Sequence, residues 1–187
     1  MWLAYTEVSA PPPVDSLLLA VTEAGVALIT FGSGPGARRQ VEESARRLGL
    51  HAERESSPGR TSAAHAELAD YLAGKRRTFD APIDWRLSNG DQLTVLRTLY
   101  DTVAYGKTTT YGELAERSGA YRDAKLAYHA ARRVGSIMGA NPVPLIVPCH
   151  RVLAADGLGG FGGGLPTKRW LLELEGVLPP TLDLCFD

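Results

Sequence analysis

Residues 108–119 read TTTYGELAERSG, and this stretch marks both the beginning and the end of a helix. Thr110 precedes Glu113 by three residues, which is the spacing of a capping box. In that motif each of the two side chains accepts a hydrogen bond from a backbone N–H that the helix start leaves unpaired. Gly119 ends the helix, because glycine takes the left-handed conformation at a C-terminus without strain. The stretch therefore predicts a short helix.

A longer helix is expected after a tight turn, over residues 122–139. Apolar side chains recur there at helical spacing, and polar ones lie toward the other side. The apolar set is Leu126, Ala130, Val134 and Ile137, and the polar set is Arg132, Arg133 and Ser136. A short helix, a turn and a second helix with small residues and arginines follow the order of a helix-turn-helix. Most such pairs merely pack together, so the pattern alone does not indicate DNA binding.

The N-terminal part has a different pattern. Residues 17–32, LLLAVTEAGVALITFG, are two apolar runs around a Glu-Ala-Gly turn, which predicts a β-hairpin. Helices are expected over residues 37–49 and 63–77, with a polar loop at 51–62 between them. This part contains neither a cysteine nor a cluster of titratable side chains. We therefore expect it to act as structural support.

A proline and an Asn-Gly turn signal in residues 79–91 place a domain boundary there, and a further helix is expected over 90–106. The fold class that follows is α+β. Residues 1–87 form a small N-terminal α/β domain with a β-hairpin sheet and a linker. Residues 88–176 form a mainly helical C-terminal domain with the helix-turn-helix and short active-site strands, and residues 177–187 form a tail.

Composition narrows the classes of protein to consider. The chain has 187 residues and a net charge of −1. This net charge alone argues against a protein that binds nucleic acid in bulk through a large excess of positive charge. Residues 103–140 nevertheless carry six basic against three acidic side chains, which suits a small phosphate footprint as well as a solvated helix face. No long apolar run or signal-peptide pattern is present. Two cysteines, Cys149 and Cys185, lack disulfide or zinc spacing, so we expect a cytoplasmic protein without metal or cofactor.

The sequence VPCHRV, residues 147–152, places Cys149 directly beside His150 at the end of the apolar run PLIV. A thiolate is the nucleophilic form of cysteine, and a free cysteine is mostly protonated at neutral pH. A neighbouring histidine can take that proton, either directly or through one water. Taken alone, Cys149 could equally be a buried, inert thiol.

Further residues decide between these readings. Five features follow one another between residues 141 and 176. They are Asn141-Pro142, an apolar segment that is expected to form a strand, Pro148-Cys149-His150-Arg151, a glycine-rich loop and a final Trp-Leu-Leu-x-x-Glu-Gly helix. Together they resemble the O6-alkylguanine-DNA alkyltransferases. The resemblance covers about residues 92–176, with a looser match of hairpin and helices before them. It implies direct-reversal DNA repair, in which Cys149 accepts the alkyl group and His150 acts as its base.

The resemblance also assigns supporting roles. Glu175 would orient the imidazole of His150, as the carboxylate of a hydrolase triad does. Asn141 would be the hinge between the second helix and the active-site segment. Because a thioether carbon offers water no carbonyl to attack, the protein should react once and remain alkylated.

The DNA partner follows from the same resemblance. The lesion lies inside a duplex stack, so the base must be flipped out, here through the minor groove. Arg132 would fill the gap, Tyr111 would donate to a guanine ring nitrogen, and the backbone carbonyls of Cys149 and Val152 would accept from the exocyclic amine. The loop Phe161, Gly162 and Gly163 would wall the alkyl pocket, and Lys168 belongs to the same DNA- and base-binding set. No membrane or obligate protein partner is implied, a monomer is expected, and cooperativity on DNA stays open.

The chain departs from the family pattern at several positions. About seven additional residues lie between Gly119 and Arg132, and they include Arg122 and Lys125. Arg133, Phe161 and Gly162 stand where a small residue, a tyrosine and a serine are common. A non-catalytic, alkyltransferase-like lesion sensor is the alternative function, although its mark is a replaced cysteine. A cysteine hydrolase is a third reading, and it gives the helix-turn-helix no role.

Overall fold

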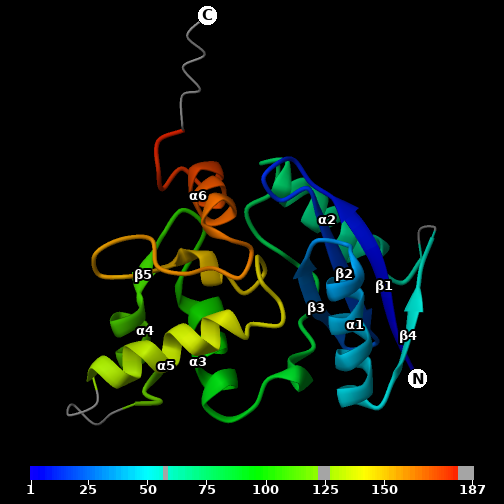
Figure 1. Cartoon of the computed structure of the whole chain (residues 1–187), viewed down its shortest axis with the longest axis horizontal. Helices are drawn as coiled ribbons and strands as arrows, with labels where there is room; N and C mark the ends of the chain where they lie inside the picture. The colour runs from blue at the N-terminus through cyan, green and yellow to red at the C-terminus, as the bar shows by residue number, and fades with distance from the viewer. Residues whose placement is uncertain (57–58, 122–126, 181–187) are drawn as a thin grey trace, which may run out of the picture.

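The computed structural model describes residues 1–56, 59–121 and 127–180. A mixed sheet and the helices around it form one half of the molecule, and a mainly helical half lies beside it (Figure 1). The sheet has the order β3-β2-β1-β4. Its strands are β1 (Trp2–Ser9), β2 (Ser16–Thr22), β3 (Gly25–Phe31) and β4 (His51–Arg54). The α+β class expected from the sequence is confirmed.

The predicted β-hairpin is present as β2 and β3, which pair antiparallel. Its turn is fastened to the linker between the two halves. Val26 N–H donates to Pro82 O at 2.8 Å, and Asp84 N–H donates to Val26 O at 2.9 Å. Gly25 has φ +131°, and a Cβ there would lie 2.1 Å from Pro82 O. Only glycine therefore fits at this turn.

The expectation of a polar loop over residues 51–62 is partly wrong. Its first four residues form β4, which pairs parallel with β1, and β1 itself was not predicted. Three of the four β4 side chains are exposed, because the strand lies at the sheet edge. A strand held by backbone hydrogen bonds and exposed to water lacks the apolar alternation from which strands are predicted.

The helices of the first half agree with the expectation, with small shifts at their ends. α1 (Pro35–Leu48) ends at Gly49, which adopts φ +69°. α2 (Ser62–Leu72) ends five residues earlier than expected. α1 covers one face of the sheet, where Leu18, Ala27 and Val41 are buried together. α2 packs on the other face, which points toward the helical half.

The helical half contains four helices and two short strands within the described residues. The helices are α3 (Gly90–Thr102), α4 (Tyr111–Ser118), α5 (Ala127–Gly139) and α6 (Leu165–Leu174). The strands β5 (Thr109–Thr110) and β6 (Val152–Leu153) pair in parallel. Two 3₁₀ turns, η1 (Trp85–Leu87) and η3 (Cys149–Arg151), complete the elements. The helix expected over 90–106 ends earlier, at Thr102.

The capping box at the start of α4 is confirmed. Glu113 N–H donates to Thr110 Oγ1 at 3.2 Å, and Thr110 N–H donates to Glu113 Oε2 at 2.8 Å. Gly119 ends the helix with φ +65°. α5 packs against α4 and ends at Gly139, as expected. The inserted Arg122 and Lys125, together with Leu126 of the apolar stripe, lie outside the described residues, as does Cys185.

The apolar run PLIV, residues 144–147, is expected from the sequence to form a strand, and this expectation is wrong. The run is a turn with an isolated bridge between Pro144 and Val147, and Leu145 has φ +76°. Pro142, Pro144 and Pro148 supply no backbone N–H, so this segment cannot form a regular ladder. The turn makes the chain re-enter the core directly before Cys149.

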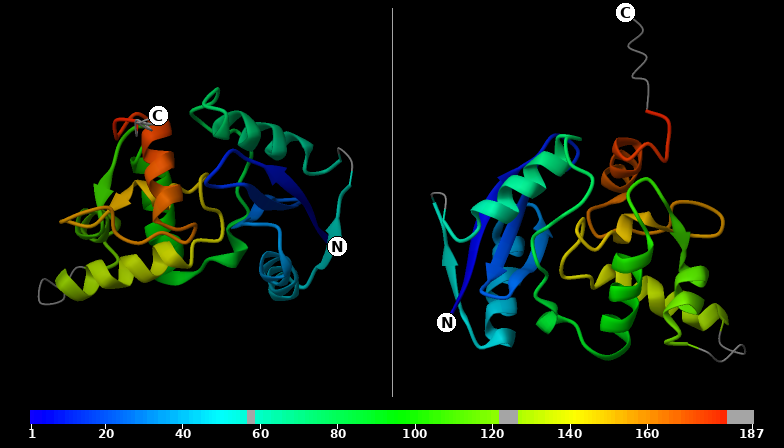
Figure 2. Two further views of the ribbon diagram at one scale, coloured as in Figure 1. Left: turned by 45° about the horizontal axis from the view of Figure 1, so that its top comes forward. Right: turned by 180° about the vertical axis from the view of Figure 1, so that it is seen from behind.

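One cluster of buried side chains runs from the sheet into the helical half. It contains Leu19 of β2, Leu68 of α2, Leu99 of α3, Val134 of α5 and Leu171 of α6. The views in Figure 2 show the two halves side by side, joined by the long connection between α2 and α3. No helix in the described ranges is long and apolar enough to cross a membrane. The division into domains at residues 87 and 88 stays a prediction.

Gly25→Ala should lower the free energy of unfolding by at least about 2 kcal/mol, because the new Cβ would collide with Pro82 O in a strained backbone. Denaturant unfolding measures the change. Gly36→Ala is the matched control, since a Cβ at this position in α1 meets nothing within 4 Å. An equal loss in both variants would contradict the docking of the hairpin turn on the linker.

Candidate active site

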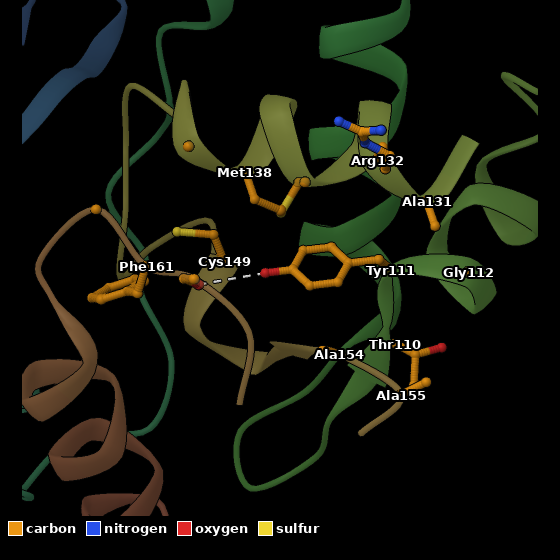
Figure 3. A pocket seen from close by; sticks show the side chains of 14 residues that line it. Thr110, Tyr111, Gly112, Ala131, Arg132, Met138, Cys149, Ala154, Ala155 and Phe161 are labelled. Atoms are coloured by element: carbon orange, nitrogen blue, oxygen red, sulfur yellow. Dashed lines mark hydrogen bonds between the residues drawn. The ribbon is translucent and has the colours of Figure 1, made fainter. Parts of the chain in front are cut away.

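A cavity of about 730 Å³ opens between α4, α5 and the loop that precedes α6. Among its lining residues are five that were predicted from the sequence as functional (Figure 3). They are Tyr111, Arg132, Cys149, Phe161 and Gly162. Residues from four separate segments of the helical half therefore meet at one cavity, with the thiol of Cys149 in its wall.

Cys149 begins the 3₁₀ turn η3 and is 5% exposed. Burial raises the pKa of its thiol to about 11. A hydrogen bond from Asn141, the charge of Lys168 and the backbone N–H groups of Cys149 and His150 act in the opposite direction. The resting group at neutral pH is therefore the thiol, and it needs a base to become a nucleophile.

Asn141 connects the end of α5 to the segment that carries the cysteine. Its Nδ2 donates to Val147 O at 2.8 Å, and its Oδ1 accepts from Val143 N–H at 3.0 Å. The neighbouring Pro142 O accepts from Ile29 N–H of β3 at 2.8 Å, so the sheet holds the same segment from the other side. These bonds fix the backbone on which the thiol is mounted.

His150 is fully buried directly behind Cys149. Its Nε2 lies 2.8 Å from Glu175 Oε1, and its Nδ1 has no hydrogen-bond partner within the described part of the chain. Because an ionised carboxylate only accepts, Nε2 carries the proton and Nδ1 presents its lone pair. Burial lowers the pKa of His150, although Glu175 acts against this shift. The imidazole is thus neutral near pH 7 and able to accept a proton.

The carboxylate of Glu175, at the end of α6, is the most heavily bonded side chain of the site. Oε1 accepts from His150 Nε2 at 2.8 Å, from Tyr71 Oη at 2.7 Å and from Arg151 Nη2 at 2.9 Å. Oε2 accepts from Arg151 Nε at 2.9 Å and from Gly106 N–H at 3.1 Å. Burial alone would raise the pKa of Glu175, but the bonds from His150 and Arg151 lower it to about 2.

Tyr71 was not predicted from the sequence as a functional residue. It lies in the last turn of α2, in the half that was expected to act only as support, and its side chain is fully buried. Its hydroxyl also lies 3.3 Å from His150 Nε2. Nothing in the local pattern of residues 63–77 marks this tyrosine, because its partners lie 79 and 104 positions further along the chain.

Tyr111 and Lys168 hold the glycine-rich loop. The ring of Tyr111 points from the start of α4 across the cavity, and its hydroxyl donates to Gly160 O at 3.4 Å (Figure 3). Lys168 is fully buried, and its Nζ donates to Val152 O, Leu158 O and Gly160 O. Burial lowers its pKa to about 8. Lys168 thus lies behind the loop, and a direct contact with DNA would require it to leave these three carbonyls.

Phe161 forms the wall between the cavity and the sheet. Its ring meets that of Phe31 of β3 edge to face, with centroids 5.3 Å apart, and lies 6.4 Å from the ring of His150. A Cβ at Gly163 would come within 2.9 Å of both phenylalanine rings, whereas one at Gly162 would meet nothing within 4 Å. Gly163 is therefore needed for packing, and Gly162 leaves the pocket wall open.

Two arginines on α5 differ in their surroundings. Arg132 is exposed and lines the cavity, where its side chain stands at the end farther from Cys149 (Figure 3). Arg133 is also exposed, and its guanidinium lies 5.5 Å from the centre of the Tyr121 ring. In the described residues no group of three or more His, Cys, Asp or Glu side chains could hold a metal ion.

Comparison with known proteins gives consistent matches. Residues 92–177 match the family described as 6-O-methylguanine DNA methyltransferase, DNA binding domain. A methylated-DNA–protein-cysteine methyltransferase of Mycobacterium tuberculosis is 44% identical over 131 residues, which are 70% of this chain and 74% of that protein. The protein of the same name from Methanosarcina acetivorans is 33% identical over 88% of this chain and 94% of its own length.

Solved structures extend the likeness to both halves. The crystal structure of M. tuberculosis OGT in complex with DNA has a TM-score of 0.72 and 35% identity, with 92% of each chain covered. That of the O6-methylguanine-DNA methyltransferase from Pyrococcus kodakaraensis strain KOD1 has a TM-score of 0.68 and 26% identity over 94% of this chain and 99% of the other. Sequence and fold agree over most of the chain, which belongs to the methylated-DNA–protein-cysteine methyltransferase family.

Proposed function

We propose that this protein repairs DNA by direct reversal and transfers the alkyl group of O6-alkylguanine in double-stranded DNA to Cys149. The observation that carries the proposal is a thiol in the wall of a large cavity, backed by a buried His150–Glu175 pair. Family membership supports the same reaction. The protein works on DNA in the cytoplasm, as a monomer without an obligate protein partner.

His150 is the proposed destination of the proton of the thiol. Nδ1 of His150 presents a buried lone pair that has no partner among the described residues, so it can accept the proton directly or through one bridging water. The thiolate then attacks the alkyl carbon in line. The S–C bond forms as the C–O6 bond breaks, the leaving guanine takes up a proton at a ring nitrogen, and the imidazolium gives up the proton it received, so that overall one proton passes from sulfur to guanine. Tyr111, whose hydroxyl faces the cavity, is the proposed donor to a guanine ring nitrogen.

The surroundings keep the thiol and the imidazole neutral at rest and stabilise the charges that form on them during the reaction. At rest both the thiol and the imidazole are neutral, because burial opposes charge on each of them. When the proton moves, the ionised Glu175 lies 2.8 Å from the new imidazolium and stabilises it. The ammonium of Lys168 favours the thiolate. The product is a thioether, which offers no carbonyl to water, so each molecule reacts once.

The base has to leave the duplex stack before it reaches the cavity. We assign this step to α5 in the minor groove, with Arg132 as the residue that enters the gap. The carbonyls of Cys149 and Val152 would accept from the exocyclic amine of guanine. Val152 O already accepts from Lys168 Nζ at 2.7 Å, and a carbonyl has a second lone pair for the amine. Phe161, Gly162 and Gly163 would enclose the alkyl group.

A non-catalytic lesion sensor is the alternative function, and the cysteine that such a protein would lack is present in this chain. The two functions predict different masses. Incubation with an oligonucleotide that contains O6-methylguanine should add the mass of one methylene group (CH₂) to the intact protein and then stop. An unchanged mass with retained binding would support the sensor, and continued turnover would support a hydrolase.

Cys149→Ser should abolish alkyl transfer and leave binding to lesion DNA within about threefold, because the groove and backbone contacts supply the affinity. Intact-mass measurement and a binding titration test the two parts separately. The matched control is Cys185→Ser, which removes the other cysteine and should transfer at the wild-type rate. Retained transfer in Cys149→Ser would rule out this residue as the acceptor.

Glu175→Gln should lower the single-turnover rate constant by about 100-fold at pH 7.5, since the imidazolium loses the charge that stabilises it. Transfer should continue slowly because the thiol remains in place. Rapid-quench measurement at saturating lesion DNA gives the rate. A wild-type rate would remove Glu175 from the proton relay.

Stability against pH provides the control for Glu175→Gln. The pKa of Glu175 is about 2 in the folded protein against an ordinary value of 4.5, so its contribution is present above pH 4.5 and is lost as pH falls toward 2. Wild type should lose about 3 kcal/mol over this range from this group, and the variant should lack that part of the pH dependence. Identical curves would show that the carboxylate is not ionised in the fold.

Arg132→Ala should slow transfer from duplex DNA by about tenfold and transfer from the free modified base by less than about twofold. Arg132 in the gap supports the extrahelical state, which costs a few kcal/mol to reach, and the free base needs no flipping. Arg133→Ala, the neighbouring exposed arginine, is the matched control and should leave both rates unchanged. Equal slowing on duplex and free base in Arg132→Ala would make Arg132 a structural residue.

A further inference from the structure

Tyr71 brings a hydroxyl from the N-terminal half into the proton relay of the C-terminal half. The hydroxyl donates to Glu175 Oε1 at 2.7 Å and lies 3.3 Å from His150 Nε2. Both partners are fully buried at their side chains, as is Tyr71 itself. Within the described residues, the other donors to the carboxylate, at Gly106, His150 and Arg151, all belong to the helical half.

The ring of Tyr71 is held on two sides, so the position of its hydroxyl is set by the fold. Its centroid lies 5.2 Å from that of Phe79 and 6.3 Å from that of Tyr105. Burial and the neighbouring Glu175 raise the pKa of Tyr71, which keeps the hydroxyl protonated and therefore a donor. A fixed donor at this place restricts the directions in which Oε1 can point.

Oε1 is the oxygen that also receives the Nε2 proton of His150. If the carboxylate rotated, the imidazole would lose its acceptor and with it the tautomer that presents the Nδ1 lone pair. Arg151 holds both carboxylate oxygens at once, because its Nε donates to Oε2 and its Nη2 to Oε1, each at 2.9 Å. The hydroxyl of Tyr71 adds a third bond to Oε1 from the opposite half of the molecule.

We propose that Tyr71 is a positioning residue for alkyl transfer, which acts through Glu175 to keep His150 oriented as the base. The proposal rests on the transfer function proposed above. It gives the N-terminal half a part in the chemistry, since the relay is complete only when α2 is docked on α6 and η3. A residue that only filled space would need the ring of Tyr71 and not its hydroxyl.

Tyr71→Phe keeps the ring and removes the hydroxyl. The rate constant for transfer at saturating lesion DNA should fall about tenfold, as expected for the loss of a hydrogen bond to a charged group, while the Kd for lesion DNA stays unchanged. The matched control is Tyr105→Phe, which removes a hydroxyl from the same aromatic cluster. That hydroxyl donates to the backbone oxygen of Leu174 at 2.9 Å, so this variant should transfer within about twofold of wild type.

A double-mutant cycle tests whether Tyr71 acts through Glu175. In the Glu175→Gln background, Tyr71→Phe should slow transfer by no more than about twofold, because the carboxylate that the Tyr71 hydroxyl orients is already gone. Phe79→Leu separates packing from positioning, since it removes part of the packing beside the ring of Tyr71 and keeps the hydroxyl, which Tyr105 and Glu175 still hold. Thermal midpoints of all variants show how much stability each change removes.

Three outcomes would overturn the positioning role. They are a wild-type rate in Tyr71→Phe, effects that multiply fully with Glu175→Gln, and equal slowing by Phe79→Leu at an equal loss of thermal midpoint. A failure of the proposed function looks different, because wild type itself would then gain no alkyl mass. These measurements therefore distinguish an error in the role proposed for Tyr71 from an error in the proposed reaction.

Discussion

The rest of the site depends on the hydrogen bonds that the buried carboxylate of Glu175 accepts. Burying an ionised group is costly unless it is paired and hydrogen-bonded, and here five donor atoms from three segments meet the carboxylate, so that four segments in all are joined at it. Those segments are α2, the turn after α3 at Gly106, η3 and the C-terminal end of α6 on which the carboxylate itself stands. Satisfying one charge therefore fixes the relative positions of the elements that carry the base and the thiol.

The thiol of Cys149 illustrates why this arrangement is needed. Burial raises its pKa to about 11 and lowers that of His150, so neither group is charged before substrate arrives. The thiol is thereby protected from electrophilic and oxidising reagents in the solvent, which react with the thiolate. In the proposed reaction the nucleophile is used only once, so it is best kept inactive until its substrate is bound. The ionised Glu175 supplies the charge that makes proton transfer possible at that moment.

Local patterns predicted those parts of the fold that local physics determines. The capping box at Thr110 and the hairpin of residues 17–32 each carry their own signal, and the structure has both. β4 carries none, because an exposed edge strand depends on backbone pairing with β1. The family resemblance grouped Cys149, His150 and Glu175, yet it gave no sign that Lys168 is buried. Tyr71 required tertiary structure, since its contacts join the two halves.

The cavity owes its shape to both halves as well. Phe31 of the sheet supports Phe161, and Lys168 and Tyr111 hold the loop behind it through Gly160 O. All of these contacts are made within the protein, so the walls of the cavity have support of their own. Binding energy then need not be spent on ordering the pocket and can instead oppose the cost of unstacking the lesion. If the acceptor is consumed by its reaction, as proposed, walls that the protein supports by itself favour transfer in the one encounter that each molecule has.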